Sequence, residues 1–252
     1  MREMNKSTSL AAEQGMDKNF KALKGVLSNY YQWNLSLFGL KKHQRILDLG
    51  CGPCLYWETI RLYEPSFYMA ADYSRQYLEA AQELLASMPG AQTVLLDLLS
   101  DELPEAILQN RFDCILLLDV LEHLEDDEKA LRTIARIMSK TGARNFYLRV
   151  PAMQSIFGTN DASIGHHRRY DRKSLQRLLE RSGFIVEKIR YQNLPGIIPW
   201  WIVGKVLKRS LAASTGEGKT FDAFVPVIKF LENMVPPPVG LSLYSVCSVR
   251  RS

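Results

Sequence analysis

The chain has 252 residues, of which 46% are hydrophobic and 23% charged, a composition that supports a sizeable buried core and excludes a disordered protein. Its four cysteines are too few for a disulfide framework. The formal net charge of +5 conceals an asymmetry, because residues 1–139 carry 14 Lys and Arg against 20 Asp and Glu, whereas residues 140–252 carry 18 against 7. The basic residues form no dense runs, so we expect an anionic substrate or membrane surface rather than a nucleic acid as partner.

The N-terminal part, residues 1–43, is predicted to form a helical cap that includes Tyr31. Residues 1–18 contain no apolar segment of signal-peptide length, and no later run approaches the roughly 18 apolar residues of a membrane-spanning helix. We therefore expect a cytoplasmic protein.

Short apolar runs alternate with amphipathic helical stretches over residues 44–192, a pattern typical of a doubly wound parallel sheet. The predicted strands are 44–49, 67–71, 92–97, 112–118, 143–150 and 184–191, and the predicted helices are 54–64, 74–87, 127–138 and 171–182. A seventh strand, 241–249, belongs to a final segment 241–252. The expected fold is therefore α/β, with a mostly parallel, Rossmann-like sheet of seven strands.

Residues 193–240 interrupt the core before the last strand. They contain an apolar segment at 194–207, a Gly/Ser/Thr-rich linker at 212–220 and a second amphipathic stretch. We expect this helical insertion to form a lid or a homodimer face. Because lysines and an arginine accompany the apolar segment, contact of residues 194–209 with the inner face of the membrane is the alternative.

The first predicted strand ends in a carboxylate and a glycine turn, Asp48, Gly50 and Gly52. A dinucleotide-binding loop places pyrophosphate at this turn, and a carboxylate there would repel the phosphates. The third glycine of such a loop is also missing. A ligand with a cationic end fits better, and S-adenosylmethionine (SAM) carries an ammonium and a sulfonium group.

Three further carboxylates follow the next strands. Asp72 follows the second strand, where a carboxylate accepts paired hydrogen bonds from ribose hydroxyls; Asp97 ends the third, within reach of an adenine amino group; and Asp119 ends the fourth, near the methionine moiety. Each could instead cap a helix or turn. Four strand-end carboxylates together with the glycine loop favour the cofactor.

In these motifs the chain resembles the class I SAM-dependent methyltransferases over residues 44–192 and the last strand. The resemblance implies a SAM site made of the four aspartates, the two glycines and the neighbouring residues Cys51, Tyr73 and Leu98. Tyr73 is expected to pack on adenine. Cys54 departs from the family, which commonly has glycine there.

Cys51, Gly52, Pro53 and Cys54 also match the CxxC motif of thioredoxins, which lowers the pKa of its first thiol. The tryptophan that precedes the first cysteine in thioredoxins is absent. A thiol–disulfide protein is therefore a remote alternative, and no second CxxC or CxxH pair supports structural zinc.

Candidate catalytic and substrate-binding residues follow strands four and five. His123, and His166 or His167, are candidate bases for removing a proton from the acceptor. Arg168, Arg169 and Tyr170, with Tyr31 from the N-terminal cap, are candidate contacts to an anionic acceptor. A packing or capping role for His123 and a structural ion-pair network of the arginines with Asp161 and Asp171 are the alternatives.

Asp119, Glu122 and His123 have the spacing of the ExxEH metal motif of ubiquinone-type and small-RNA O-methyltransferases, and His166 could be a further ligand. The same spacing occurs in metal-independent relatives. We expect no metal and keep this site as the alternative.

The run His167 to Tyr170 and the ending Pro236 to Gly240 are similar to a bacterial subgroup associated with glycan or lipid-linked assembly. The predicted function is methyl transfer from SAM to a small-molecule or lipid-linked acceptor, at an oxygen atom of an anionic substrate. A catalytically silent SAM-binding regulatory protein is the second hypothesis. A nucleic-acid methyltransferase is the third, disfavoured because an Asn/Asp, Pro, Pro, aromatic motif is missing.

Overall fold

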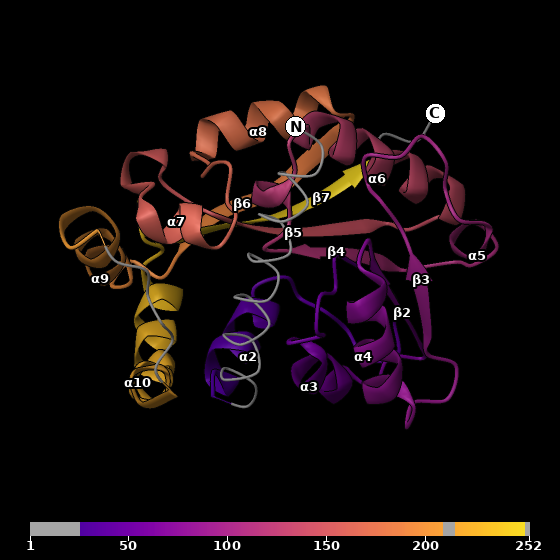
Figure 1. Cartoon of the computed structure of the whole chain (residues 1–252), viewed down its shortest axis with the longest axis horizontal. Coiled ribbons are helices and arrows are strands. Elements are labelled where there is room, and N and C mark those ends of the chain that lie inside the picture. The colour runs from indigo at the N-terminus through magenta and orange to yellow at the C-terminus, as the bar shows by residue number, and fades with distance from the viewer. Residues whose placement is uncertain (1–25, 209–214, 250–252) are drawn as a thin grey trace.

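The computed structural model describes residues 26–208 and 215–249 and contains a seven-stranded sheet in the order β3-β2-β1-β4-β5-β7-β6 (Figure 1). The strands are β1 (Arg45–Leu49), β2 (Phe67–Asp72), β3 (Gln92–Leu95), β4 (Cys114–Leu118), β5 (Asn145–Pro151), β6 (Phe184–Gln192) and β7 (Ser242–Val249). Strands β1 to β5 pair in parallel, and β7 lies antiparallel between β5 and β6. The predicted α/β fold with a mostly parallel sheet is confirmed.

Helices cover both faces of the sheet (Figure 1). One face packs against α2 (Ser28–Ser36), α3 (Trp57–Ile60), α4 (Arg75–Leu85) and α10 (Thr215–Met234), and the other against α5 (Glu105–Leu108), α6 (Asp127–Thr141) and α8 (Arg172–Arg181). The connections contain α7 (Thr159–Ser163), α9 (Ile197–Trp201), the π-helical turn η4 (Ile202–Val206) and the 3₁₀ turns η1 (Arg61–Tyr63), η2 (Leu121–His123) and η3 (Gln154–Ile156).

The central strands are apolar because both of their faces are buried. In the paired strands β1 and β4, Leu47 and Ile115 belong to the core under α6 and α8, whereas Ile46 and Cys114 belong to the core under α2, α3 and α4. This is the two-residue alternation of a pleated strand. Continuous apolar runs are therefore the expected pattern for this sheet.

Two predicted segments differ from the structure. The helix expected over 54–64 begins only at Trp57 and continues as η1, because Cys54 takes up a left-handed conformation (φ 54°) that a helix cannot include. The expected linker at 212–220 is helical from Thr215 onward, although residues 212–214 lie outside the described ones. Of the predicted N-terminal cap, residues 1–25 also lie outside them, and α2 is the helix observed in the remainder.

Helix α10 supplies the N-terminal cap of α2. The carboxylate of Asp222 accepts hydrogen bonds from the backbone N–H groups of Asn29 (3.0 Å) and Tyr30 (2.9 Å) at the N-terminus of α2. The side chain of Asn29 donates in return to the Asp222 carbonyl (3.1 Å). A residue 193 positions away thus caps a helix that has no side-chain cap of its own, which holds α2 beside the sheet.

The order of the strands reverses at β1, which lies between β2 and β4. In open α/β sheets, ligands bind beyond the carboxyl ends of the strands at such a switch point. Asp48, Asp72 and Asp119 lie at the carboxyl ends of β1, β2 and β4, and Asp97 follows β3 by two residues. The topology therefore brings the four predicted aspartates to one edge.

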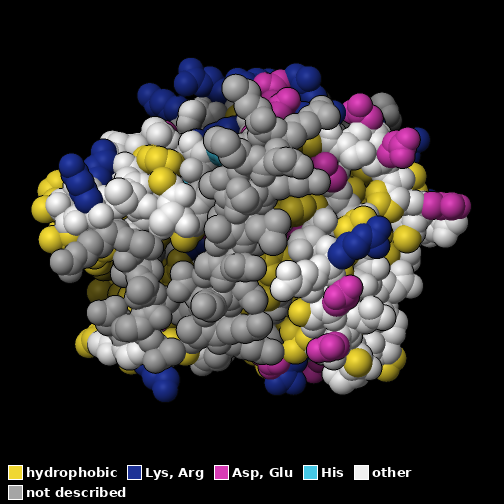
Figure 2. All heavy atoms as spheres, viewed as in Figure 1, with side chains coloured by type: hydrophobic (Ala, Val, Ile, Leu, Met, Phe, Trp, Pro, Cys, Tyr) yellow, Lys and Arg dark blue, Asp and Glu magenta, His cyan; other side chains and the backbone are white. Residues whose placement is uncertain are grey.

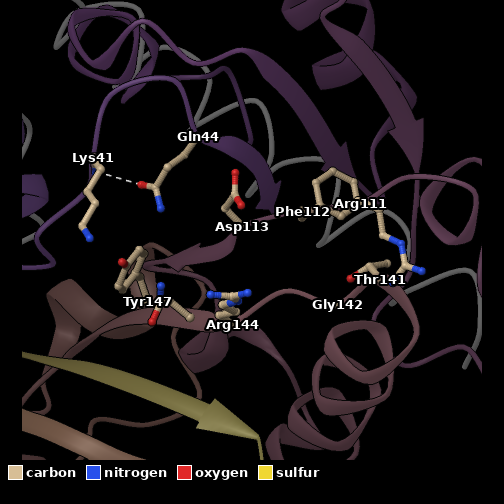
Figure 3. A pocket seen from close by; sticks show the side chains of 10 residues that line it. Lys41, Gln44, Arg111, Phe112, Asp113, Thr141, Gly142, Arg144 and Tyr147 are labelled. Atoms are coloured by element: carbon tan, nitrogen blue, oxygen red, sulfur yellow. Dashed lines mark hydrogen bonds between the residues drawn. The ribbon is translucent and has the colours of Figure 1, made fainter.

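A hollow of about 470 Å³ lies at the opposite edge of the sheet, where β1, β4 and β5 begin (Figure 3). Its lining includes Lys41, Gln44, Asp113 and Arg144, and the backbone N–H of Lys41 donates to the Gln44 side chain (2.8 Å). Amino ends of parallel strands are not where ligands of this fold bind. We therefore assign no part of the site to this hollow.

Within the described residues, none of the helices is both long and apolar enough to cross a membrane.

Candidate active site

The turn after β1 depends on two glycines for different reasons. Gly50 has φ 65°, and a Cβ there would lie 2.6 Å from Cγ2 of Val120, so both the backbone conformation and the close approach of the β4 loop require glycine. Gly52 has φ 51°, but a Cβ there would meet no atom of residues 26–208 and 215–249 within 4 Å. The turn is therefore packed on one side and open on the other.

Asp48 is buried beneath this turn and accepts a hydrogen bond of 2.5 Å from the Tyr68 hydroxyl. Burial raises the pKa of the Asp48 carboxyl to about 7, although the Tyr68 hydrogen bond opposes the shift and the charge of Asp72 adds to it. A cation placed near Asp48 would favour its ionised form. The buried carboxylate is thus suited to a positively charged ligand.

Asp72 is held at the same turn by backbone groups. Its Oδ2 accepts from the N–H of Gly52 (2.8 Å) and its Oδ1 from the N–H of Ser74 (2.9 Å). The adjacent Tyr73 side chain is exposed. This arrangement fixes the direction of the carboxylate relative to the open side of Gly52, as binding a pair of hydroxyl groups requires.

Asp97 and Leu98 form the next part of the edge. Asp97 is exposed and its Oδ1 accepts from the N–H of Leu99 (2.8 Å), whereas Leu98 is buried in the core. The buried leucine anchors the loop, and the carboxylate remains at the surface of the site.

Asp119 lies in a left-handed conformation (φ 58°) directly after β4. Its carboxylate pairs with the guanidinium group of Arg149 on β5, and the Tyr56 hydroxyl lies 3.4 Å from its second oxygen. Arg149 also donates to the hydroxyls of Tyr30 and Ser242. This network aligns Asp119 and neutralises part of its charge.

Arg149 and Tyr56 are site residues that the sequence analysis missed. A charged residue within the apolar run of β5 was the available signal for Arg149, because a buried arginine needs a partner. Tyr56 packs edge to face on the predicted Tyr31, with ring centroids 4.8 Å apart. Burial raises the pKa values of both tyrosines, so both remain hydroxyl donors.

The two thiols of the glycine turn do not show the electrostatics of a redox motif. The hydrogen bond with Cys54, together with burial, raises the pKa of Cys51, whereas a nucleophilic thiol needs a lowered one. Both cysteines are free, and the left-handed backbone of Cys54 is the conformation that glycine favours. This explains why glycine is common at this position in the family that the sequence resembles.

His123 and His166 come together across the edge, with ring centroids 4.8 Å apart. Nδ1 of His123 lies 3.2 Å from the Gly165 carbonyl, and Nδ1 of His166 lies 2.9 Å from Oδ1 of Asp161. Both partners can only accept, so each Nδ1 carries a proton. Burial and the neighbouring His166 lower the pKa of His123 to about 4, which keeps its imidazole neutral at pH 7.

Glu122 lies beside the two imidazoles and is almost completely buried. Among the described residues, neither of its carboxylate oxygens has a hydrogen-bond partner, and Oε1 lies 3.6 Å from Nε2 of His166. Ligand atoms of Glu122, His123 and His166 all lie within 4.8 Å of one another, and Asp119 is not part of this group. The structure thus brings together three of the four residues of the alternative metal site.

Asp161 supports this group from behind. Its Oδ1 also accepts from Nε of Arg169 (2.6 Å), and its Oδ2 lies 3.3 Å from Nε1 of Trp200. Burial opposes ionisation, but these partners and His166 lower the pKa of Asp161. The pair of Asp161 with Arg169 is part of the ion-pair network that the sequence analysis kept as the alternative for the arginines. Trp200 was missed, because its contact with Asp161 spans 39 positions.

The expected substrate contacts of Arg169 and Tyr170 must be corrected. Arg169 is buried, and besides Asp161 it donates to the Ala152 carbonyl (2.8 Å). Tyr170 is buried as well, and its hydroxyl donates to Asp127 (2.9 Å). Because their polar groups are already paired inside the protein, both residues support the loop instead of facing an acceptor.

Arg168 and His167 lie nearer the surface. Arg168 is partly exposed, forms an ion pair with Asp127 (3.0 Å) and donates to the Glu125 carbonyl (2.8 Å). His167 has an exposed side chain, and its backbone N–H donates to the Glu122 carbonyl (2.8 Å). Of the predicted run, these two residues remain available to an acceptor.

A family profile described as a methyltransferase domain matches residues 27–189. The chain belongs to this methyltransferase family. Solved structures similar to the methyltransferase include a chain from the complex between the Haloferax volcanii Trm112 methyltransferase activator and a proposed methyltransferase, with 15% identity, a TM-score of 0.62, and 95% of this chain and 97% of that chain covered. Among curated proteins, none matches the chain.

Two further solved structures are SAM-dependent methyltransferases. One is a TehB-like enzyme from Corynebacterium glutamicum, with 16% identity, a TM-score of 0.57, and 95% of this chain and 99% of that chain covered. The other is from Mesorhizobium loti, with 17% identity, a TM-score of 0.55, and 85% and 95% covered. At these identities the likeness shows the shared fold, and the family match assigns the activity: the protein is a SAM-dependent methyltransferase.

The residues present fit SAM as the cofactor of the methyltransferase. Gly52 leaves open space at the turn, Asp72 is oriented beside it, and Asp48 provides a buried carboxylate for a cationic ligand. When bound, SAM supplies an electrophilic methyl group on its sulfonium. Asp48, Gly50, Cys51, Gly52, Asp72, Tyr73, Asp97, Leu98 and Asp119 remain the residues that we predict to form its site.

Proposed function

We propose that the enzyme transfers the methyl group of SAM to an oxygen atom of an anionic small-molecule or lipid-linked acceptor. The observation that carries this proposal is the arrangement of Glu122, His123 and His166 beyond the carboxyl end of β4. The Nδ1 atoms of both imidazoles are engaged by the protein, so the Nε2 atoms are the ones available to an acceptor, and the neutral His123 can take a proton there. A hydroxyl group is a poor nucleophile until its proton is taken.

Methyl transfer is an in-line displacement, so the protein mainly aligns the acceptor and removes its proton. In the proposed step the acceptor oxygen forms the new bond to carbon, the sulfur–carbon bond breaks, and the hydroxyl proton passes to an Nε2 atom. The fixed Nδ1 contacts of His123 and His166 hold the rings in position for this. Arg168 and His167 lie near the surface in the connection between β5 and α8, and we propose that they bind the anionic group of the acceptor. Tyr31 of α2 is proposed as a further contact to the acceptor.

A divalent cation at the same three residues is the second candidate. Glu122 offers two buried oxygens without hydrogen-bond partners, and the two Nε2 atoms complete a two-histidine, one-carboxylate set. The Nδ1 contact from His166 to Asp161 is the kind of outer contact that orients metal-binding imidazoles. A cation held there would act as a Lewis acid toward the acceptor oxygen.

Substitution of Glu122 separates the two candidates. Glu122→Gln keeps the shape but removes the charge, and Glu125→Gln, at an exposed position nearby, is the matched control. If a cation is required, Glu122→Gln loses Mn²⁺ binding in calorimetry, and chelator abolishes wild-type turnover. If an imidazole acts as the base alone, chelator has no effect and His123→Gln and His166→Gln lower kcat.

Turnover to S-adenosylhomocysteine tests the proposal as a whole, with acceptors that carry a hydroxyl beside a carboxylate or phosphate. The catalytically silent alternative predicts that S-adenosylhomocysteine binds but no acceptor is methylated. Methylation of amines only, with hydroxyl acceptors inert, would contradict the oxygen assignment.

A further inference from the structure

Helix α10 has two apolar faces, of which the sheet side covers only one. On that side, Val225 is buried, Asp222 caps α2, and the Glu232 carboxylate accepts from the backbone N–H groups of Asn193 (3.1 Å) and Leu194 (2.8 Å). The helix is therefore docked by specific contacts, and its orientation is set.

The opposite side of α10 carries a second apolar stripe. Phe224, Val227, Leu231 and Met234 follow one another at helical spacing, and Phe224 and Met234 are 61% and 67% exposed. Apolar side chains at this spacing normally face a core. Nothing in the described residues covers them, so the stripe is suited to contact another apolar phase.

The segment formed by α9 and η4 also carries exposed apolar side chains. Ile198 and Trp201 are 65% and 45% exposed, although the segment is firmly seated on the loop after β5. Gly204 packs against Gly158 so closely that a Cβ on Gly158 would lie 2.9 Å from the Gly204 carbonyl oxygen. That carbonyl also accepts from the Thr159 hydroxyl (2.8 Å). The exposed side chains thus project from a fixed base.

The charged residues near the exposed apolar side chains indicate whether a second copy of the chain or an anionic membrane covers them. In residues 194–208 and 218–239, the charged side chains that reach solvent are lysines, whereas the two acidic ones, Asp222 and Glu232, are buried. Lys208 and Lys219 are exposed. A second copy of the chain would bring lysines against lysines, but anionic lipid headgroups would pair with them while acyl chains cover the apolar stripes.

We propose that α9, η4 and α10 form a membrane-docking face that lies on the surface of an anionic bilayer. Figure 2 shows hydrophobic side chains at the edge of the molecule where Figure 1 places α9 and α10, with Lys and Arg side chains beside them. Trp200, on α9, contacts Asp161 and thereby the histidine group. Docking therefore places the acceptor side of the enzyme close to the bilayer, which suits a lipid-linked acceptor.

Vesicle sedimentation of the full chain tests the docking face without any methyl transfer. We expect binding to vesicles of phosphatidylcholine and phosphatidylglycerol (3:1) and at least tenfold weaker binding to pure phosphatidylcholine. The triple variant Ile198→Ser, Phe224→Ser, Met234→Ser should lose at least tenfold in partition. The matched control Leu62→Ser, Ile185→Ser, which removes exposed apolar side chains on η1 and β6, should bind as wild type.

The charge part is tested by Lys208→Gln with Lys219→Gln, which should weaken binding about 25-fold at low salt, since each lysine near an anionic surface contributes about fivefold. Absence of wild-type binding to anionic vesicles, or equal binding of the triple variant, would overturn the proposal. A stable dimer in sedimentation velocity that the triple variant abolishes would assign the face to a second copy instead. Calorimetry with S-adenosylhomocysteine on the same variants shows whether the cofactor site is intact, so that a loss of vesicle binding can be told apart from a loss of the cofactor site.

Discussion

Alanine substitution of the two glycines of the β1 turn should affect folding stability and cofactor binding in opposite order. Alanine at either position must take up a left-handed conformation, which costs about 1 kcal/mol. At Gly50 the new Cβ would also lie 2.6 and 2.7 Å from the methyl carbons of Val120. Such overpacking adds about 1–3 kcal/mol. We therefore expect Gly50→Ala to lower the free energy of unfolding by about 2–4 kcal/mol and Gly52→Ala by about 1 kcal/mol.

The order should reverse for cofactor binding. The Cβ of Gly52→Ala would enter the open space beside the turn, where we place SAM, while the protein around it is unchanged. We expect at least a tenfold loss of affinity for S-adenosylhomocysteine, or about 1.4 kcal/mol. Urea denaturation measures the first effect, and isothermal titration calorimetry measures the second.

The reasoning fails if Gly52→Ala binds S-adenosylhomocysteine as tightly as wild type, since the open side would then not hold the cofactor. It also fails if the two variants lose equal stability, since the contact with Val120 would then be relieved without cost. A Gly50→Ala protein that cannot be purified leaves the Gly52→Ala measurement intact.

Three further predictions concern the same edge of the sheet. Because the pKa of Asp48 is raised to about 7, cofactor affinity should rise about tenfold from pH 6 to pH 8 as the carboxylate ionises, and Asp48→Asn should abolish this dependence in calorimetry. Because its pKa is raised on folding, Asp48 holds its proton more tightly in the folded state than in the unfolded state, so the free energy of unfolding should fall as pH rises from about 4 to 7. Urea titrations of the wild type and of Asp48→Asn can check this. Mild oxidant should weaken cofactor binding reversibly by joining Cys51 and Cys54, whereas Cys54→Gly, which suits the left-handed backbone, should keep its affinity; equal sensitivity of both would contradict this. Arg169→Met should lower the unfolding free energy by about 3–5 kcal/mol because it leaves Asp161 buried without its main partner, and a change below 1 kcal/mol would show that the pair is dispensable.

Much of the fold followed from local patterns in the sequence. Each of the seven strands was expected within a few residues of its position. The central strands β1, β2, β4 and β5 are continuous apolar runs because they are buried on both faces. The helix expected from Cys54 begins late because a left-handed backbone conformation decides its boundary. Propensity cannot register a cap such as Asp222 that comes from the other end of the chain.

The sequence by itself determined that the four aspartates of the predicted cofactor site share one edge of the sheet. Asp48, Asp72, Asp97 and Asp119 follow successive strands, and parallel pairing brings their carboxyl ends to one edge whatever the details of packing. The acceptor half depended on tertiary structure. Only the folded chain seats Arg169 and Tyr170 in the interior, places Asp161 behind His166 and leaves the Glu122 carboxylate without a hydrogen bond from the described residues. Burial and pairing are set by residues far apart in sequence, and these contacts decide which polar groups remain free to do chemistry.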